Sequence, residues 1–97
     1  MVRVRQTVVF RAWFEALRDR IAQKRILVRI GRLERGLFGD AKSVGEGVGE
    51  LRVDHGPGYR LYFTRRGEDV VILLCGGDKS SQQRDVAAAL RLAREAE

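Results

Sequence analysis

The chain has 97 residues, of which 44% are hydrophobic and 33% are charged, which fits a single globular domain over residues 1–97 and leaves no room for two. No apolar run approaches the ~18–20 residues needed to cross a membrane, and a single cysteine cannot form a disulfide framework. With one histidine and one cysteine the chain cannot build a His/Cys zinc site, and we expect neither a metal nor a cofactor.

The N-terminus is charged rather than apolar, so we expect no signal peptide, no membrane association and a cytoplasmic protein. The net charge of +6 is unevenly spread: residues 1–35 hold ten basic and three acidic residues, whereas residues 36–97 hold nine and ten. Most of the basic residues are arginine, whose forked guanidinium suits phosphate geometry. The N-terminal third therefore points to RNA, DNA or an acidic partner, although many small proteins are basic without binding nucleic acid.

The first predicted elements are a strand and two helices. Residues 3–9 are rich in β-branched residues, which predicts a strand. Apolar residues then recur at helical spacing, at Phe10, Trp13, Phe14, Leu17 and Ile21. Asp19 can cap a second helix that runs to Leu33 or Arg35, where Gly36 is placed to end it. The apolar positions of this second helix are Ala22, Ile26, Ile30, Leu33 and Leu37.

A basic set of side chains lies beside this apolar stripe. Its members, at spacings of 7, 4 and 3 residues, are Arg18, Arg25, Arg29 and Arg32. Such a face can contact the phosphates of RNA, or it can simply be solvated. The spacing alone leaves both readings open.

A glycine-rich loop and a β-hairpin come next. Glycines spaced through residues 36–49 predict the loop. Residues 48–54 and 59–65 each alternate between apolar and polar side chains, and the HGPG sequence between them signals a turn. The apolar faces match only if Leu51 lies opposite Leu61, because a shift of one residue would mix the two faces.

The last two predicted elements are a strand and a helix. The continuously apolar residues 69–75 predict a central strand buried on both faces, ended by Gly76 and Gly77, and residues 81–95 predict a helix. The fold class is therefore α+β, with the order β-α-α-β-β-β-α. Three consecutive strands favour an antiparallel meander, with the N-terminal helical pair packed on one face.

The hairpin register brings two arginines together. It sets Arg52 opposite Arg60 and Glu50 opposite Tyr62, and a like-charge pair costs roughly 0.2–1 kcal/mol. Such a pair either holds an anion or is neutralised diagonally by Glu50 and Asp54. Paired guanidinium groups can stabilise the charge of a phosphoryl transition state without a metal.

Acid–base groups are harder to assign. The candidates are Tyr62, Tyr59, His55, Glu50 and Lys79. His55 has the right chemistry, but a lone histidine at a turn is more often inert. The GGDKSSQ segment is not a P-loop, because Asp78 separates Gly77 from Lys79. Lys79 instead lies at the start of the last helix, where it is either solvated or directed at the mouth of the sheet.

Three segments together resemble a known family of toxins. They are GDAKSVGEGVGELR, GPGYRLYF and LLCGGDKSSQQRDVAAAL, and they resemble the Gp49-like branch of the RelE/ParE toxin superfamily, close to HigB-type addiction-module killer proteins. The resemblance extends over nearly the whole chain. It implies a small RelE-like fold and a type II toxin, whose antitoxin is a helix-turn-helix protein from the adjacent gene.

The resemblance also implies an activity. Toxins of the RelE and HigB kind cut mRNA on the ribosome by metal-free attack of a ribose 2′-hydroxyl on the adjacent phosphate. Arg60 matches the most persistent catalytic arginine, Arg52 a second basic position, and Lys79 the lysine at the end of the last strand; Tyr62, Tyr59, Asp78 and Lys42 match less directly. We therefore expect a catalytic set of Arg52, Arg60, Lys79 and Tyr62, and ribosome contacts from Arg18, Arg25, Arg29, Arg32 and Lys42.

Three functions remain to be separated. The chain lacks both the lysine-rich face with a C-terminal tyrosine of RelE and the histidine set of classical HigB toxins, so the resemblance assigns no general base. The leading hypothesis is a ribosome-dependent mRNA endonuclease. The alternatives are a ParE-like inhibitor of DNA gyrase without nuclease activity, and a basic RNA-binding or phage-derived accessory domain.

Overall fold

The computed structural model describes residues 1–96 and contains one five-stranded mixed sheet with the strand order β1-β5-β4-β3-β2. The strands are β1 (Arg3–Gln6), β2 (Ala41–Gly45), β3 (Val48–Val53), β4 (Tyr59–Arg66) and β5 (Val70–Asp78). The helices are α1 (Val8–Ala16), α2 (Arg20–Glu34), the short 3-10 helix η1 (Lys79–Ser81) and α3 (Gln82–Glu95). The predicted α+β class and small RelE-like fold are confirmed.

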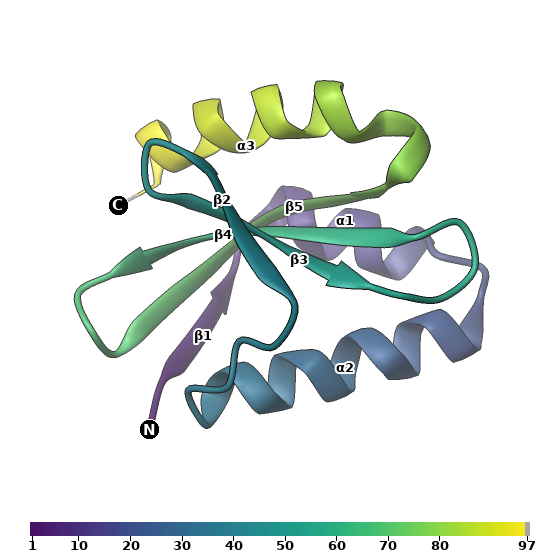
Figure 1. Ribbon diagram of the computed structural model, residues 1–97, viewed down its shortest axis with the longest axis horizontal. Helices are drawn as coiled ribbons and strands as arrows, with labels where there is room; N and C mark the ends of the chain where they lie inside the picture. Colours follow the sequence, from purple (N-terminus) through teal and green to yellow (C-terminus); the bar gives the residue numbers. More distant parts are fainter. Residues whose placement is uncertain (97) are drawn as a thin grey trace.

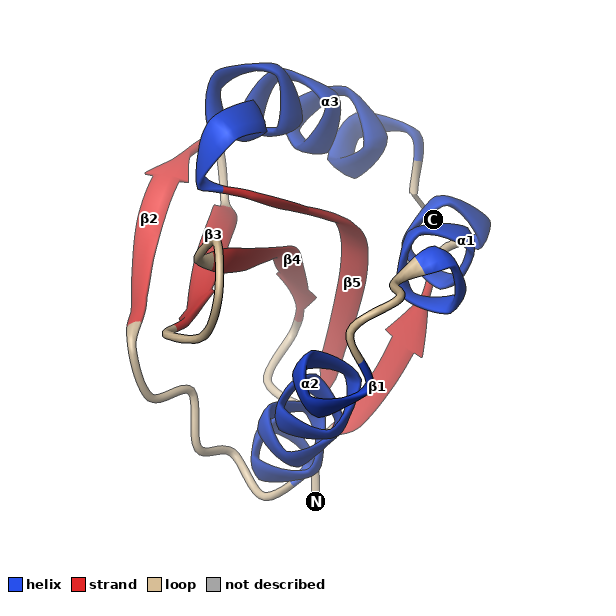
Figure 2. Ribbon diagram, turned by 90° about the vertical axis from the view of Figure 1, so that its right-hand side faces the viewer, coloured by secondary structure: helices blue, strands red, loops and turns tan. Residues whose placement is uncertain are grey.

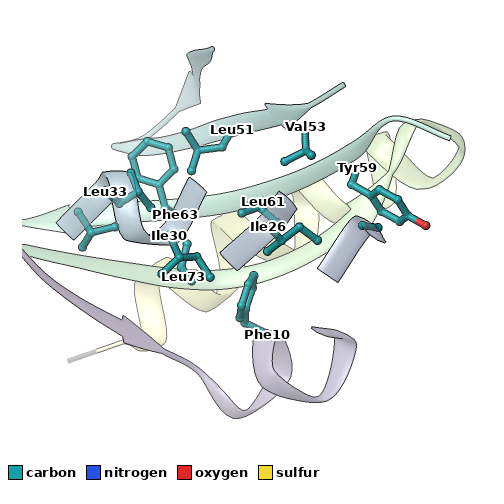
Figure 3. Close-up of a cluster of buried hydrophobic side chains, with 12 residues drawn as sticks. Phe10, Ile26, Ile30, Leu33, Leu51, Val53, Tyr59, Leu61, Phe63 and Leu73 are labelled. Carbon is teal, nitrogen blue, oxygen red and sulfur yellow. The ribbon is translucent and has the colours of Figure 1, made fainter. Parts of the chain in front are cut away.

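The helices lie on opposite faces of the sheet. Figures 1 and 2 show α3 on one face and the pair α1 and α2 on the other, as predicted for the N-terminal pair. Two apolar clusters follow from this layering. The first packs Phe10, Ile26 and Leu33 against Leu61 and other side chains of the sheet (Figure 3), and the second packs the opposite face of the sheet against α3.

Side-chain caps set where the first two helices begin. The Thr7 hydroxyl accepts a hydrogen bond from the Phe10 N–H at 3.0 Å, so the chain leaves β1 after Gln6, earlier than the predicted end at residue 9. Asp19 caps α2 as predicted, accepting from the Ala22 N–H at 3.0 Å. Gly36, with a φ of 78°, follows the helix end as predicted.

The apolar stripe of α2 is buried as predicted at four positions, Ala22, Ile26, Ile30 and Leu33. Two other apolar residues of the predicted helices are exposed to solvent instead. Leu37 is 50% exposed, because the chain turns away at Gly36 before reaching it, and Ile21 is 59% exposed on the outer face of α2.

Residues 36–49 do not form only a loop, and the prediction missed a strand there. Ala41–Gly45 pair antiparallel with β3, and a tight turn through Glu46 and Gly47 joins the two strands. Both turn residues have positive φ angles. Glycines that serve this turn and a bulge between Ser43 and Gly45 obscure the alternation that marks a strand.

The sheet is mixed rather than wholly antiparallel. Strands β2 to β5 form the predicted meander, but β1 pairs in parallel with β5. The helical pair carries the chain from one edge of the sheet to the other, which leaves β1 beside the last strand (Figure 1).

The central strand β5 is buried on both faces, as predicted, but it does not end at the two glycines. It continues to Asp78, with Gly76 paired to Leu61 and Gly77 paired to Arg60. A Cβ atom at Gly76 would overlap the Trp13 ring, and one at Gly77 would overlap the Asp85 carboxylate. These glycines therefore permit close packing on both faces rather than ending the strand.

Candidate functional site

The predicted hairpin register is confirmed. Leu51 pairs with Leu61, and the same ladder sets Arg52 opposite Arg60 and Glu50 opposite Tyr62. The two arginines lie near the turn between β3 and β4. This is the end of the sheet at which β5 gives way to η1.

A hollow of about 420 Å³ brings three of the four predicted catalytic residues together. Arg52, Arg60 and Lys79 line it, with the carboxylates of Asp40 and Asp54. Lys79 reaches this place because β5 extends to Asp78 beside β4, and because its backbone N–H donates to the Pro57 carbonyl at 3.4 Å. Three cations from three different elements thus surround one concavity.

The two arginines differ in how they are compensated. Arg52 donates twice to one oxygen of Asp40, with Nη2–Oδ1 at 2.8 Å and Nε–Oδ1 at 3.2 Å. Arg60 forms no ion pair among residues 1–96, and its Nε is buried without a hydrogen-bond partner there. Because Arg60 lines the hollow and no carboxylate among residues 1–96 pairs with it, its guanidinium is the cation at which this hollow can take an anion.

The sequence interpretation in which Glu50 and Asp54 neutralise the arginine pair is not what the structure shows. The carboxylate that pairs with Arg52 is Asp40, from the segment before β2. Glu50 is fully buried, and its Oε2 accepts from the Tyr62 hydroxyl at 2.9 Å and from Gln82 Nε2 at 2.8 Å. Its other oxygen faces Lys42 Nζ at 3.9 Å.

Arg29 holds the segment that carries Asp40. Its guanidinium donates to the carbonyl oxygens of Arg52, of Phe38 at 3.0 Å and of Asp40 at 3.5 Å. The Arg52 N–H also donates to the Asp40 carbonyl at 3.0 Å. Burial lowers the pKa of Arg29 from its usual value. The Arg29 side chain is thus directed at the backbone of β3 and of the segment before β2, which it holds together.

The tyrosines lie elsewhere. Tyr62 is fully buried in the cluster under α3, where burial, and then the hydrogen bond to Glu50, raise the pKa of its hydroxyl far above the usual value. Tyr59 lies in the other cluster (Figure 3), where its ring contacts the Trp13 ring, and burial raises the pKa of its hydroxyl as well. Neither tyrosine lines the hollow.

His55 and Asp78 have structural partners. His55 Nε2 lies 3.0 Å from Asp19 Oδ2, so the histidine joins the hairpin turn to the start of α2. The Ala22 N–H, and then His55, lower the pKa of Asp19. Asp78 accepts from the Ser80 hydroxyl and, at 2.8 Å, from the Ser80 N–H, which lowers its pKa and caps η1.

The expected ribosome-contacting residues do not form one surface. Arg25, Arg29 and Arg32 line a second hollow of about 370 Å³ along α2, together with Lys24 and Val28. Arg18 lies before the Asp19 cap, outside that hollow. Lys42 lies on the edge strand β2, with a half-exposed side chain.

The sequence profile described as Phage derived protein Gp49-like (DUF891) matches residues 12–96. The chain belongs to this family. It is also 46% identical over 94 residues to an uncharacterized protein of Haemophilus influenzae, an alignment that covers 97% of this chain and 95% of the relative. Gp49-like proteins are an addiction-module toxin family, which suggests a toxin of a toxin–antitoxin pair with an antitoxin as its partner.

In this Gp49-like chain, sequence reasoning missed the role of Asp40. The sequence could have indicated it only if β2 had been predicted: once Ala41 pairs with Leu51, Asp40 must lie beside Arg52.

Within residues 1–96, every helix is too short or too polar to span a bilayer.

Proposed function

We propose that this Gp49-like toxin is a metal-independent endoribonuclease that cleaves mRNA on the ribosome in the cytoplasm. The observation that carries the proposal is the hollow that Arg60, which forms no ion pair among residues 1–96, shares with Arg52 and Lys79. Family membership supports the toxin class, and the nuclease activity rests on this hollow.

The proposed chemistry uses the cations of the hollow. The 2′-oxygen of a ribose bonds to the adjacent phosphorus as the bond from phosphorus to the 5′-oxygen breaks, which leaves a 2′,3′-cyclic phosphate and a 5′-hydroxyl. The proton of the 2′-hydroxyl passes to water, and water supplies the proton that the departing 5′-oxygen takes up. Arg60 donates to the phosphate, while Arg52 and Lys79 stabilise the negative charge that develops on it.

Binding to the ribosome is assigned to exposed basic residues outside the hollow. Arg25 and Arg32 project from α2 without an ion pair among the described residues, and we assign them, with Arg18 and Lys42, to contacts with RNA phosphates. Arg29 is left out of this set, because its guanidinium is bound to backbone carbonyls.

The test is cleavage in a translating extract. Wild-type protein, Arg60→Ala and the control Arg11→Ala, an exposed residue of α1, are each added to a reporter mRNA, and cuts are mapped by primer extension. We expect cuts in phase with codons from the wild type and the control, but not from Arg60→Ala. The proposal is wrong if the wild-type protein stops the growth of cells while their mRNA stays intact. DNA breaks in the same cells would indicate an inhibitor of DNA gyrase instead.

A further inference from the structure

The charged side chains that line the hollow have a net charge of only +1. Arg52, Arg60 and Lys79 contribute three positive charges, and Asp40 and Asp54 contribute two negative charges. An internal phosphodiester of RNA carries one negative charge. A terminal phosphomonoester carries nearly two at neutral pH, because its second pKa is about 6.

Asp40 is a fixed part of this charge balance. Its carboxylate is bound by both Nε and Nη2 of Arg52, and its backbone carbonyl is held by the Arg52 N–H and by Arg29. The backbone contacts keep Asp40 beside Arg52, and the ion pair directs its carboxylate toward that arginine. Any anion bound at Arg60 therefore meets the negative charge of Asp40.

The effect of that charge depends on the charge of the ligand. Attraction to the site grows in proportion to the ligand's charge, whereas the cost of removing the ligand from water grows with the square of its charge. A site with a small positive excess therefore favours a monoanion. A site with a larger excess moves the preference toward a dianion.

We propose that Asp40 is a specificity-determining residue that adjusts the hollow to a singly charged internal phosphodiester and against a doubly charged terminal phosphate. The identity of the ligand as RNA rests on the proposed function. The selectivity itself rests on the ion pair between Asp40 and Arg52 and on the unpartnered Arg60. Such selectivity suits an enzyme that cuts within a chain rather than at its ends.

The test compares two ligands that cannot be cleaved, because both lack the 2′-hydroxyl adjacent to the phosphate. One is a dinucleotide with a single internal phosphodiester, 2′-deoxyuridylyl-adenosine, and the other is 2′-deoxyuridine 3′-monophosphate. Each is titrated by calorimetry or NMR at pH 7.5 and low salt into wild type and Asp40→Asn. Asparagine keeps the Oδ1 acceptor for Arg52 while removing the charge, so the fold is expected to survive, and an unchanged Tm verifies this.

Asp40→Asn should bind the dinucleotide roughly three- to tenfold more tightly, the range for unit charges about 3–6 Å apart at the dielectric constant of water, which suits an exposed site. The monophosphate should gain about the square of that factor, because it carries twice the charge. Each ligand is compared with itself across the two proteins, so contacts to the bases cancel. Glu68→Gln, in the turn at the far end of β4, makes the same change in net charge and should leave the affinity ratio unaltered.

Equal gains for the two ligands, or the same shift in Glu68→Gln, would overturn the inference. Binding that survives in Arg60→Gln would overturn it too, because the ligand would then lie outside the hollow. The assay needs neither ribosomes nor cleavage. A normal selectivity shift with no mRNA cleavage in the extract would therefore refute the proposed function and leave this inference standing.

Discussion

Arg52 and Arg60 face each other across the ladder between β3 and β4, yet only Arg52 has a carboxylate partner among the residues described. Two equivalent guanidinium groups are thus made unequal by Asp40, which approaches from the segment before β2. The unequal pair gives the hollow one compensated cation and one that is open to an anion.

Arg60→Ala should abolish toxicity while leaving the fold intact. The variant loses the group that the proposed mechanism assigns to the phosphate, and loss of one such donor typically lowers a rate by about 10²–10³. Cleavage in the extract measures the loss, and an unchanged Tm shows that the protein is folded. A soluble Arg60→Ala protein that still kills cells would exclude Arg60 from the site.

Arg52→Ala should also reduce cleavage, partly because it leaves the Asp40 carboxylate without its ion-pair partner. Removing Arg52 leaves the Asp40 carboxylate without its partner, 2.8 Å away in the present structure, and thus free to repel the phosphate. The double variant Arg52→Ala/Asp40→Asn should therefore recover part of the activity, roughly three- to tenfold. Strictly additive losses in this double-mutant cycle would show that Asp40 does not act on the phosphate.

The parts of the fold that could be predicted are those with a clear periodicity. The pairing of Leu51 with Leu61 followed from two alternating strands, because a shift of one residue mixes apolar and charged faces. The stripe of α2 followed from helical spacing in the same way. Strand β2 could not be predicted, because its bulge and the glycines of its turn erase the alternation.

The site was predicted less completely for a related reason. Arg29 borders the buried stripe of α2, whereas Arg25 and Arg32 lie further round the helix. Spacing places Arg29 nearest the stripe but does not show what its guanidinium binds, because the carbonyls that accept from it belong to the segment before β2 and to β3. The role of Asp40 was hidden for the same reason, since both contacts require the position of β2.

Substitutions on α2 should separate structural from RNA-binding arginines. Arg29→Gln removes charged donors from several backbone carbonyls and should lower the free energy of unfolding by about 1.5–3 kcal/mol. Arg25→Gln/Arg32→Gln should leave stability within about 0.5 kcal/mol. Urea denaturation measures both effects.

The same double variant should bind ribosomes with a weaker dependence on salt. Each lost phosphate contact releases fewer counterions, so the slope of log affinity against log salt should fall by about two. Pelleting with ribosomes at several salt concentrations measures the slope. The matched control Arg84→Gln/Arg91→Gln, on α3, should not change it, and an unchanged slope in the α2 variant would mean that this face is merely solvated.

Acid should weaken the link between α2 and the hairpin turn. The pKa of Asp19 is lowered in the folded state, so its contribution to stability is present above its unfolded pKa of about 3.9 and is lost as the pH falls through the lower folded value. Asp19→Asn keeps a capping side chain without the charge. The urea midpoint of the wild type should therefore fall more steeply than that of Asp19→Asn below pH 4, and parallel curves would show that His55 and the cap contribute no charge-dependent stability.

Lys79 should support catalysis rather than stability. Its side chain is exposed, its position at the start of η1 is opposed by the helix dipole, and its hydrogen bond to the hairpin turn, at Pro57, comes from the backbone N–H. In the hollow, however, it supplies one of the three positive charges around the phosphate. Lys79→Gln should therefore lower mRNA cleavage roughly tenfold, the effect of one charge a few ångströms from the reacting group, and leave Tm unchanged or slightly raised.

Two control variants separate charge from position. Lys79→Arg should keep most of the activity because it keeps the charge, and Lys24→Gln, the same change on α2, should leave the cleavage step intact. Cleavage by Lys79→Gln at the wild-type rate would remove this lysine from the site and leave the two arginines as its only cations.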